Sequence, residues 1–232
     1  MEAAPFGSIL VWGAPGSGKT LFGWNSPYKP VLYFDFERSS LPYRRLAEKY
    51  EVKVVDIADL KQFLDYVGKI PANKYKTVMF DTGWQPFDWL SNHIFEKAGP
   101  KAEKQSQLVW ADVRKAIREI MLDVMGKCEM FILTAHTRKY MDRQEEPRIS
   151  PTPFELVDVA IQLVRRPNEQ LPCGIVGTRN RLMGLLPPKI TPCTWEKILE
   201  YTVNPPDWNN LKPEEIAEDK IYVPIGDSLE MA

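Results

Sequence analysis

The chain has 232 residues, a length that allows one large α/β domain with a sizeable core. Its composition, 44% hydrophobic and 26% charged, is typical of a soluble globular protein. The net charge of −1 excludes an overall basic field, so any binding of nucleic acid must come from a local patch.

The sequence predicts neither a membrane span nor a secretion signal. No apolar run approaches the roughly 18 residues that a span needs, and the N-terminus lacks a basic stretch followed by an apolar one. Three scattered cysteines, Cys128, Cys173 and Cys193, form no CxxC pair, which indicates free or buried thiols in a reducing compartment. We therefore expect a cytoplasmic protein, with a host cytosol as the alternative place of synthesis.

Strands and helices alternate along the chain. The first half predicts strands over residues 8–12, 30–36, 52–56 and 77–80, and helices over 19–24, 42–50 and 60–70. The second half predicts helices over 86–97 and 108–125, a polar segment over 98–107 between them, a strand over 130–135, a long loop over 138–153, a helix-to-strand return over 154–164 and a strand over 174–178.

Continuous apolar strands that alternate with helices indicate an α/β fold with a mostly parallel central sheet, covered by helices on both faces. No internal repeat and no second domain are evident. We expect residues 1–203 to form the folded core and the Pro-, Asn- and acid-rich residues 204–232 to form a loose acidic tail.

The most specific motif lies at the end of the first predicted strand. The residues Gly13, Ala14, Pro15, Gly16, Ser17, Gly18, Lys19 and Thr20 have the spacing of a P-loop, placed between a strand and a helix. Glycines let the backbone wrap a polyphosphate, whose charge the loop N–H groups and the helix N-terminus attract. We expect Lys19 to reach the β- and γ-phosphates and the Thr20 hydroxyl to ligate Mg²⁺, so ATP and Mg²⁺ are the expected cofactors.

Asp81 ends the apolar strand over residues 77–80. A carboxylate in that place can hold Mg²⁺ beside Thr20, directly or through water. An acidic residue at a strand end is common, but an upstream P-loop makes it the expected second metal-binding residue.

Two further residues follow predicted strands. Glu37 comes after the strand that follows the P-loop helix, where a carboxylate can polarise the water that attacks the γ-phosphate; a solvated acid is the alternative. His136 follows the strand over residues 130–135 and is a candidate sensor of the γ-phosphate, although a lone histidine is more often structural. Asp35 is a candidate supporting group for Glu37.

Two polar segments carry basic residues that are candidates for binding DNA. They are Lys101 and Lys104 in the earlier segment, and Arg138, Lys139, Tyr140, Arg143 and Arg148 in the later one. Charges can follow the phosphates of a single strand while an aromatic ring stacks on a base. Acidic neighbours in the later segment favour a merely solvated loop instead, so both interpretations stand. We expect the two segments at the same sheet edge.

Arg179 and Arg181 leave the last predicted strand. Arginines supplied by a neighbouring subunit can stabilise the charge of a phosphoryl-transfer transition state. An ordinary basic turn is the alternative interpretation.

The chain resembles the RecA/Rad51 recombinase core in a series of stretches that occur in the same order. They are the P-loop, Tyr-Phe-Asp-Phe-Glu37, Phe-Asp81-Thr82, Leu-Thr-Ala-His136-Thr-Arg and Arg179-Asn-Arg181. The resemblance covers about residues 7–190 and is strongest to compact phage nucleotide-binding proteins with this core, some of which anneal single strands. It implies a RecA-like P-loop NTPase fold.

The resemblance also implies roles. Glu37 would hold the catalytic glutamate position, and His136 the position where bacterial recombinases carry a glutamine sensor. Segments 98–107 and 138–153 would match the two DNA-binding loops. Arg179 and Arg181 would match the basic pair that contacts ATP on the adjacent protomer, where the family has lysines. The separate helical or polymerisation domain of full recombinases is not expected, because the first strand begins within a handful of residues.

We therefore expect a Mg²⁺-dependent, DNA-stimulated ATPase that binds single-stranded DNA and promotes annealing or strand exchange, with ATP between protomers. The expected partners are single-stranded DNA, further copies of the chain in a ring or filament, and a single-strand-binding protein. One alternative is a ring-forming DNA motor such as a helicase or packaging ATPase. Another is a small-molecule kinase in which residues 138–148 form a lid.

Overall fold

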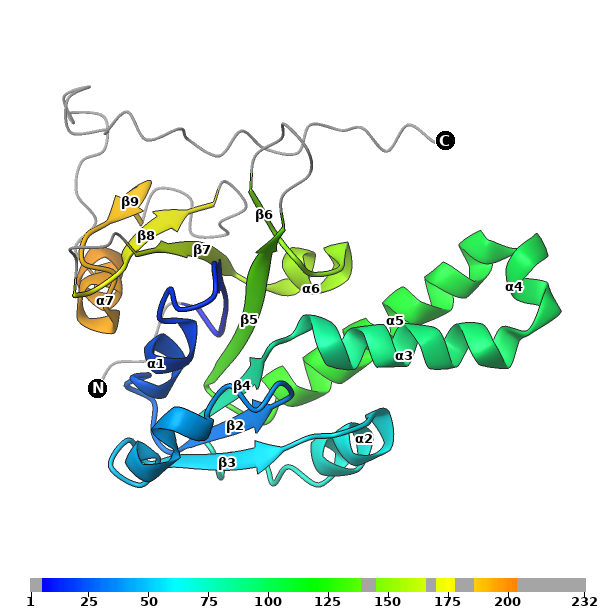
Figure 1. Cartoon of the computed structure of the whole chain (residues 1–232), viewed down its shortest axis with the longest axis horizontal. Coiled ribbons are helices and arrows are strands. Elements are labelled where there is room, and N and C mark those ends of the chain that lie inside the picture. The colour runs from blue at the N-terminus through cyan, green and yellow to red at the C-terminus, as the bar shows by residue number, and fades with distance from the viewer. Residues whose placement is uncertain (1–5, 139–144, 166–169, 178–185, 204–232) are drawn as a thin grey trace.

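A computed structural model describes residues 6–138, 145–165, 170–177 and 186–203 of the chain. Its centre is a nine-stranded sheet with the order β3-β2-β4-β5-β1-β7-β8-β9, in which β6 pairs with β5 (Figure 1). The strands are β1 Ser8–Gly13, β2 Val31–Asp35, β3 Val52–Asp56, β4 Thr77–Asp81, β5 Met130–Arg138, β6 Glu146–Pro147, β7 Val159–Val164, β8 Cys173–Val176 and β9 Lys189–Ile190.

The strands from β3 to β7 in this order run parallel, whereas β6, β8 and β9 pair antiparallel with their neighbours. The mostly parallel sheet confirms the predicted fold class. Because β1 lies between β5 and β7, the loop that follows β1 emerges at the centre of the carboxyl edge, where sheets of this kind bind their ligands.

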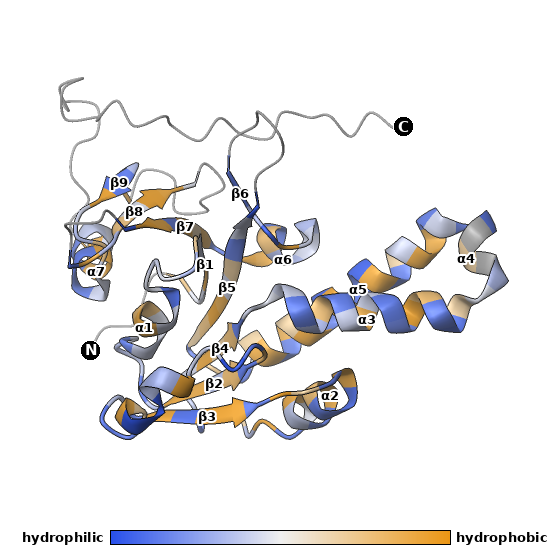
Figure 2. Ribbon diagram, viewed as in Figure 1, coloured by the Kyte–Doolittle hydropathy of each residue, from blue (hydrophilic) through white to orange (hydrophobic). Residues whose placement is uncertain are grey.

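Helices cover both faces of the sheet. They are α1 Lys19–Trp24, α2 Leu60–Gly68, α3 Trp84–Ala98, α4 Pro100–Lys104, α5 Ser106–Met125, α6 Pro151–Leu156 and α7 Trp195–Val203. Alternate residues of one strand face opposite layers: Ile9 packs in the cluster with α1 and α7, and Leu10 in the cluster with α2, α3, α5 and α6. Figure 2 shows the resulting apolar strands enclosed between the helices.

The prediction of a polar loop over residues 98–107 is wrong, because α4 forms there. Gly99 ends α3 with φ 55°, a left-handed value that suits glycine, and Pro100 opens α4. Helices α3, α4 and α5 together form an arm that extends beyond the sheet (Figure 1). The 20 residues of α5 span about 30 Å at the α-helical rise.

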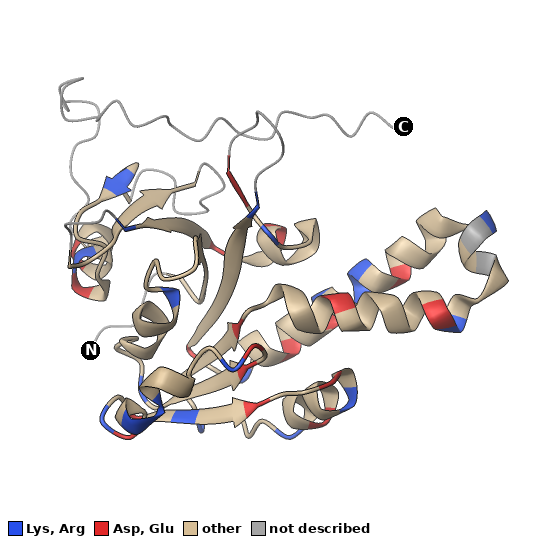
Figure 3. Cartoon of the chain, viewed as in Figure 1, with Lys and Arg blue, Asp and Glu red and all other residues tan. Residues whose placement is uncertain are grey.

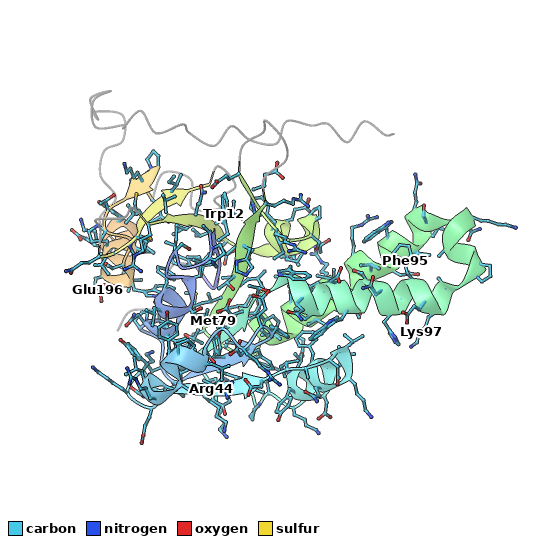
Figure 4. All side chains as sticks on the ribbon, in the orientation of Figure 1. Trp12, Arg44, Met79, Phe95, Lys97 and Glu196 are labelled. Atoms are coloured by element: carbon cyan, nitrogen blue, oxygen red, sulfur yellow. The ribbon has the colours of Figure 1, made fainter. Side chains whose placement is uncertain are left out.

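The arm is held together by its own apolar contacts. Phe95 of α3 and Trp110 of α5 stack edge to face, with ring centroids 4.9 Å apart. Figure 4 shows Phe95 between the two helices, with Lys97 on the outside of α3. Since α4 lies at the far end of the arm, Lys101 and Lys104 are not at the sheet edge beside β6, contrary to expectation.

The predicted loop over residues 138–153 is also partly wrong. Strand β5 continues through His136 to Arg138, because Thr137 and Arg138 pair with the short strand β6, and α6 begins at Pro151. His136 therefore lies inside the strand rather than after it. The helix predicted over residues 42–50 is a 3₁₀ helix at Leu41–Leu46.

Two elements after residue 188 were not predicted, β9 and α7. Trp195, at the start of α7, is 3% exposed and stacks on Phe22 of α1 with ring centroids 4.9 Å apart. Its indole N–H donates to the Phe22 carbonyl oxygen at 2.8 Å. Helix α7 thereby fixes the helix that follows the P-loop.

The cysteines are free thiols, as predicted. Burial raises the pKa of both Cys128 and Cys193 to about 12, which favours the protonated thiol at neutral pH. In the described part of the chain, no helix has the length and apolar character needed to cross a membrane.

Candidate nucleotide site

The P-loop takes its shape from glycines in conformations that other residues adopt poorly. Gly18 precedes α1 with φ 97°. Gly13 ends β1 with φ 155°, and a Cβ atom there would lie 2.4 Å from the Leu163 carbonyl oxygen and 2.8 Å from the Ser17 hydroxyl. Both positions therefore require glycine, as the motif predicted.

Lys19 is directed back onto the start of the P-loop. It is 6% exposed, and its Nζ donates to the carbonyl oxygens of Gly13 at 2.9 Å and of Ala14 at 3.0 Å. Burial lowers the pKa of Lys19, while the charges of Asp81 and Glu37 oppose this change. An anion bound at the same place would stabilise this buried ammonium group, which is otherwise held by neutral carbonyl oxygens.

The remaining P-loop side chains fit a triphosphate as ligand. The Ser17 hydroxyl is buried without a hydrogen-bond partner among the described residues, a costly arrangement that a bound phosphate oxygen would relieve. The described residues contain no group of three or more His, Cys, Asp or Glu that could hold a metal. A divalent ion here would thus depend on Thr20, Asp81, phosphate oxygens and water, which is the ligand set that Mg²⁺ prefers.

Asp81 is 2% exposed, and hydroxyl groups from α1, β2, β5 and the turn after β2 converge on its carboxylate. Its Oδ2 accepts from Thr20 at 2.7 Å and from Tyr33 at 2.8 Å, and the Ser39 Oγ lies 3.3 Å from it. Its Oδ1 accepts from Thr134 of β5. The predicted pair of Thr20 and Asp81 is thus brought together, with its carboxylate held in one orientation.

Glu37 and His136 also meet beside this carboxylate. The Glu37 Oε2 lies 3.0 Å from the His136 Nε2, and its Oε1 accepts from the Thr82 hydroxyl at 2.9 Å. The bond to His136 lowers the pKa of Glu37; burial opposes this shift, and the Thr82 bond adds to it. Glu37 is therefore ionised at neutral pH, in the state that can orient or deprotonate a water molecule.

Asp35 supports the turn that carries Glu37. It is fully buried, and its two oxygens accept from the backbone N–H groups of Ser39 at 2.9 Å and of Ser40 at 3.0 Å. The Ser40 hydroxyl donates to the same carboxylate. A carboxylate that accepts several hydrogen bonds at a chain turn fixes the backbone there.

Those basic residues predicted to bind DNA that the structure describes do not form one patch. Arg148 stacks its guanidinium on the Trp84 ring, 4.2 Å from the centroid, and the backbone N–H of Arg148 donates to the His136 carbonyl oxygen at 2.7 Å. Arg138 pairs with Glu146 at 3.5 Å. Lys101 and the exposed Lys104 belong to α4. Lys139, Tyr140, Arg143, Arg179 and Arg181 lie outside the described residues.

Sequence reasoning missed several polar residues of the site. They are Tyr33, Ser39, Thr82, Trp84 and Thr134. Thr82 follows Asp81 directly, and Thr134 stands two residues before His136, so the alternation of side chains along a strand predicts that Thr134 and His136 share a face. The roles of Tyr33 and Ser39 depend on strand register and turn geometry.

Comparisons with known proteins identify the family and the fold of the chain. The sequence profile of the family described as "AAA domain" matches residues 7–163 of the chain. No protein of curated function matches it in sequence.

Among solved structures, the RadB recombinase is similar with a TM-score of 0.50 and 19% identity, over 75% of this chain and 81% of that one. A KaiC-like protein of the archaeon Pyrococcus horikoshii is similar with a TM-score of 0.41 and 14% identity, over 74% of this chain and 77% of that one. The likeness to the recombinase shows the fold, and the profile covers most of the sheet and the whole P-loop. The chain belongs to the AAA domain family of P-loop NTPases and has a RecA-like fold.

Proposed function

We propose that this chain is a Mg²⁺-dependent ATPase whose ATP-bound form binds single-stranded DNA and promotes strand annealing or exchange. The observation that supports it best is the meeting of Glu37 and His136, 3.0 Å apart, beside the P-loop lysine and Asp81. A binding module needs only the P-loop. An ionised carboxylate held next to it is what hydrolysis requires.

Each residue has a separate task in this proposal. Lys19 would leave the carbonyl oxygens of the loop for the phosphates, and Thr20, oriented by Asp81, would hold the metal ion. Bound Mg²⁺ would neutralise the negative charge that the phosphates carry. Glu37 would orient the attacking water and accept its proton, while His136 and Thr82 hold the carboxylate in place.

The DNA-binding part rests on the basic residues and on analogy with the RadB recombinase, whose fold this chain shares. Basic residues occur at α4 and on α5 (Figure 3), and Trp110 is 45% exposed on the same arm. Aromatic rings beside basic groups suit a single strand. Arg179 and Arg181 would contact ATP bound by a neighbouring protomer in a ring or filament. A single-strand-binding protein is the further partner proposed.

Fluorescence anisotropy with labelled oligo-dT tests the DNA-binding part. We expect binding that strengthens with ATP and Mg²⁺ and weakens as salt rises. Lys19→Ala should lose the response to ATP while retaining its fold, which makes it the matched control. Phosphate release, measured in parallel, should increase when single strands are added.

Other outcomes would contradict the proposal. Absence of binding to single strands at low salt would rule out the DNA-binding part. ADP formation that requires a small acceptor molecule would indicate a kinase. Phosphate release that responds only to duplex DNA would indicate a motor.

A further inference from the structure

Tyr33 carries a hydroxyl group in the core of the protein for which packing alone gives no reason. It lies in β2, is fully buried, and packs edge to face on Trp24 with ring centroids 5.6 Å apart. Phenylalanine would make the same apolar contacts. A buried hydroxyl is costly unless it makes good hydrogen bonds, so its partners indicate its role.

The Tyr33 hydroxyl connects two parts of the candidate site. It donates to the Asp81 Oδ2 at 2.8 Å and lies 2.9 Å from the Ser39 Oγ. A phenol hydroxyl carries one proton. Since that single proton is given to Asp81, Ser39 must donate to Tyr33.

Ser39 belongs to the turn that presents Glu37. Its backbone N–H donates to Asp35 at 2.9 Å, and its side chain lies 3.3 Å from Asp81. A chain of hydroxyls therefore runs from the Glu37 turn through Ser39 and Tyr33 to Asp81. The Glu37 turn lies at one end of this row of hydroxyls and Asp81 at the other. The row therefore fixes the distance between the Glu37 and Asp81 carboxylates.

We propose that Tyr33 and Ser39 are positioning residues that align Glu37 with Asp81. This inference rests on the proposed ATPase function, because it assigns them to the geometry of that reaction. Neither touches the nucleotide in this role. Their loss should lower the rate of hydrolysis and leave nucleotide affinity nearly unchanged.

The test is Tyr33→Phe, which removes one hydroxyl and keeps the ring. Its matched control is Tyr66→Phe on α2, the same change at a residue that is 46% exposed. We expect kcat for ATP to fall about tenfold, the change that losing one hydrogen bond to a charged group produces. Binding of ATP–Mg²⁺, measured by calorimetric titration, should change less than about twofold, and Tyr66→Phe should match the wild type.

A double-mutant cycle separates positioning from a structural effect. In a Glu37→Gln background, adding Tyr33→Phe should lower kcat no further, because the group being positioned is already gone. Ser39→Ala tests the same chain of hydroxyls at a residue outside the core, should Tyr33→Phe fail to fold. It should also lower kcat with little change in affinity.

Two results would overturn the inference. One is that the wild type hydrolyses ATP and that the Tyr33→Phe and Ser39→Ala variants each hydrolyse it with the same kcat. The other is a full additional loss when Tyr33→Phe is added to Glu37→Gln. A wild type that neither binds nor hydrolyses ATP would instead overturn the proposed function, and this inference with it.

Discussion

Glu37 and His136 are 99 positions apart in the chain, yet their side chains lie 3.0 Å apart. They meet because β2 and β5 both flank β4, so the carboxyl ends of these strands share one edge. The same order brings Asp81, at the end of β4, between them. The contact between Glu37 and His136 predicts that a substitution of His136 changes the pKa of Glu37.

His136→Asn should raise the pKa of Glu37 towards its ordinary value, because the hydrogen bond from His136 is the main cause of its lowering. The acid limb of the kcat profile should therefore move to higher pH. His93→Asn is the matched control, since His93 is the other of the two histidines in the chain. Steady-state phosphate release across pH measures both. Identical profiles for His136→Asn and the wild type would show that the two side chains are not coupled.

Stability should respond to pH through the same pair. A carboxyl group whose pKa is lower in the folded state stabilises the fold fully above its ordinary pKa, near 4.5. That contribution is lost as the pH falls through the lowered value. His136→Asn should therefore lose less stability on acidification than the wild type does.

Residues at the ends of strands were the easiest to predict. Glu37 and Asp81 follow apolar runs, and the structure places both at the carboxyl edge. Tyr33 and Ser39 could not be recognised in the same way. The Tyr33 hydroxyl reaches Asp81 through the register of β2 on β4, and Ser39 does so through a turn held by Asp35, neither of which periodicity encodes.

At the scale of elements, the arm of α3, α4 and α5 departs most from expectation. The dipeptide Gly99-Pro100 indicates an interruption, and one helix does end there. A second helix begins at once, because proline is favoured in the first turn, where its missing N–H costs nothing. The dipeptide is compatible both with a loop and with the start of a second helix. The packing between α3 and α5 decides between the two.

The arm can be tested separately from the sheet. Lys101→Ala with Lys104→Ala should weaken binding of oligo-dT and reduce the slope of log affinity against log salt by about 1.4, if each lysine contacts one phosphate. Lys53→Ala with Lys61→Ala, at exposed positions of β3 and α2, is the control pair. Anisotropy titrations at several salt concentrations give both values. An unchanged slope would show that α4 does not touch the DNA.

Helix α7 could not be inferred from the motifs. Its residues follow a Pro-rich stretch, and its apolar face packs on the protein through Trp195, which stacks on Phe22, far earlier in the chain. Long-range contacts of this kind are invisible to local pattern. Their effect is nonetheless on the site, because α1 carries Lys19 and Thr20.

At the scale of the molecule, alternation of apolar strands and helices was enough to predict a doubly covered, mostly parallel sheet. The order of the strands placed the P-loop at the centre of the carboxyl edge, with β5 on one side and β7 on the other. Everything proposed for Glu37, His136 and Tyr33 requires that a triphosphate binds at that place. The assembly between protomers, DNA binding and strand annealing proposed above depend on it in turn.

Calorimetric titration of the wild-type protein with a non-hydrolysable ATP analogue and Mg²⁺ tests that requirement most directly. Saturable binding is expected, with an affinity about a hundredfold weaker in Lys19→Ala, the loss that corresponds to one buried charge-assisted contact. Circular dichroism should show both proteins equally folded. No heat of binding in the folded wild type, or equal affinity in Lys19→Ala, would contradict the assignment of the site.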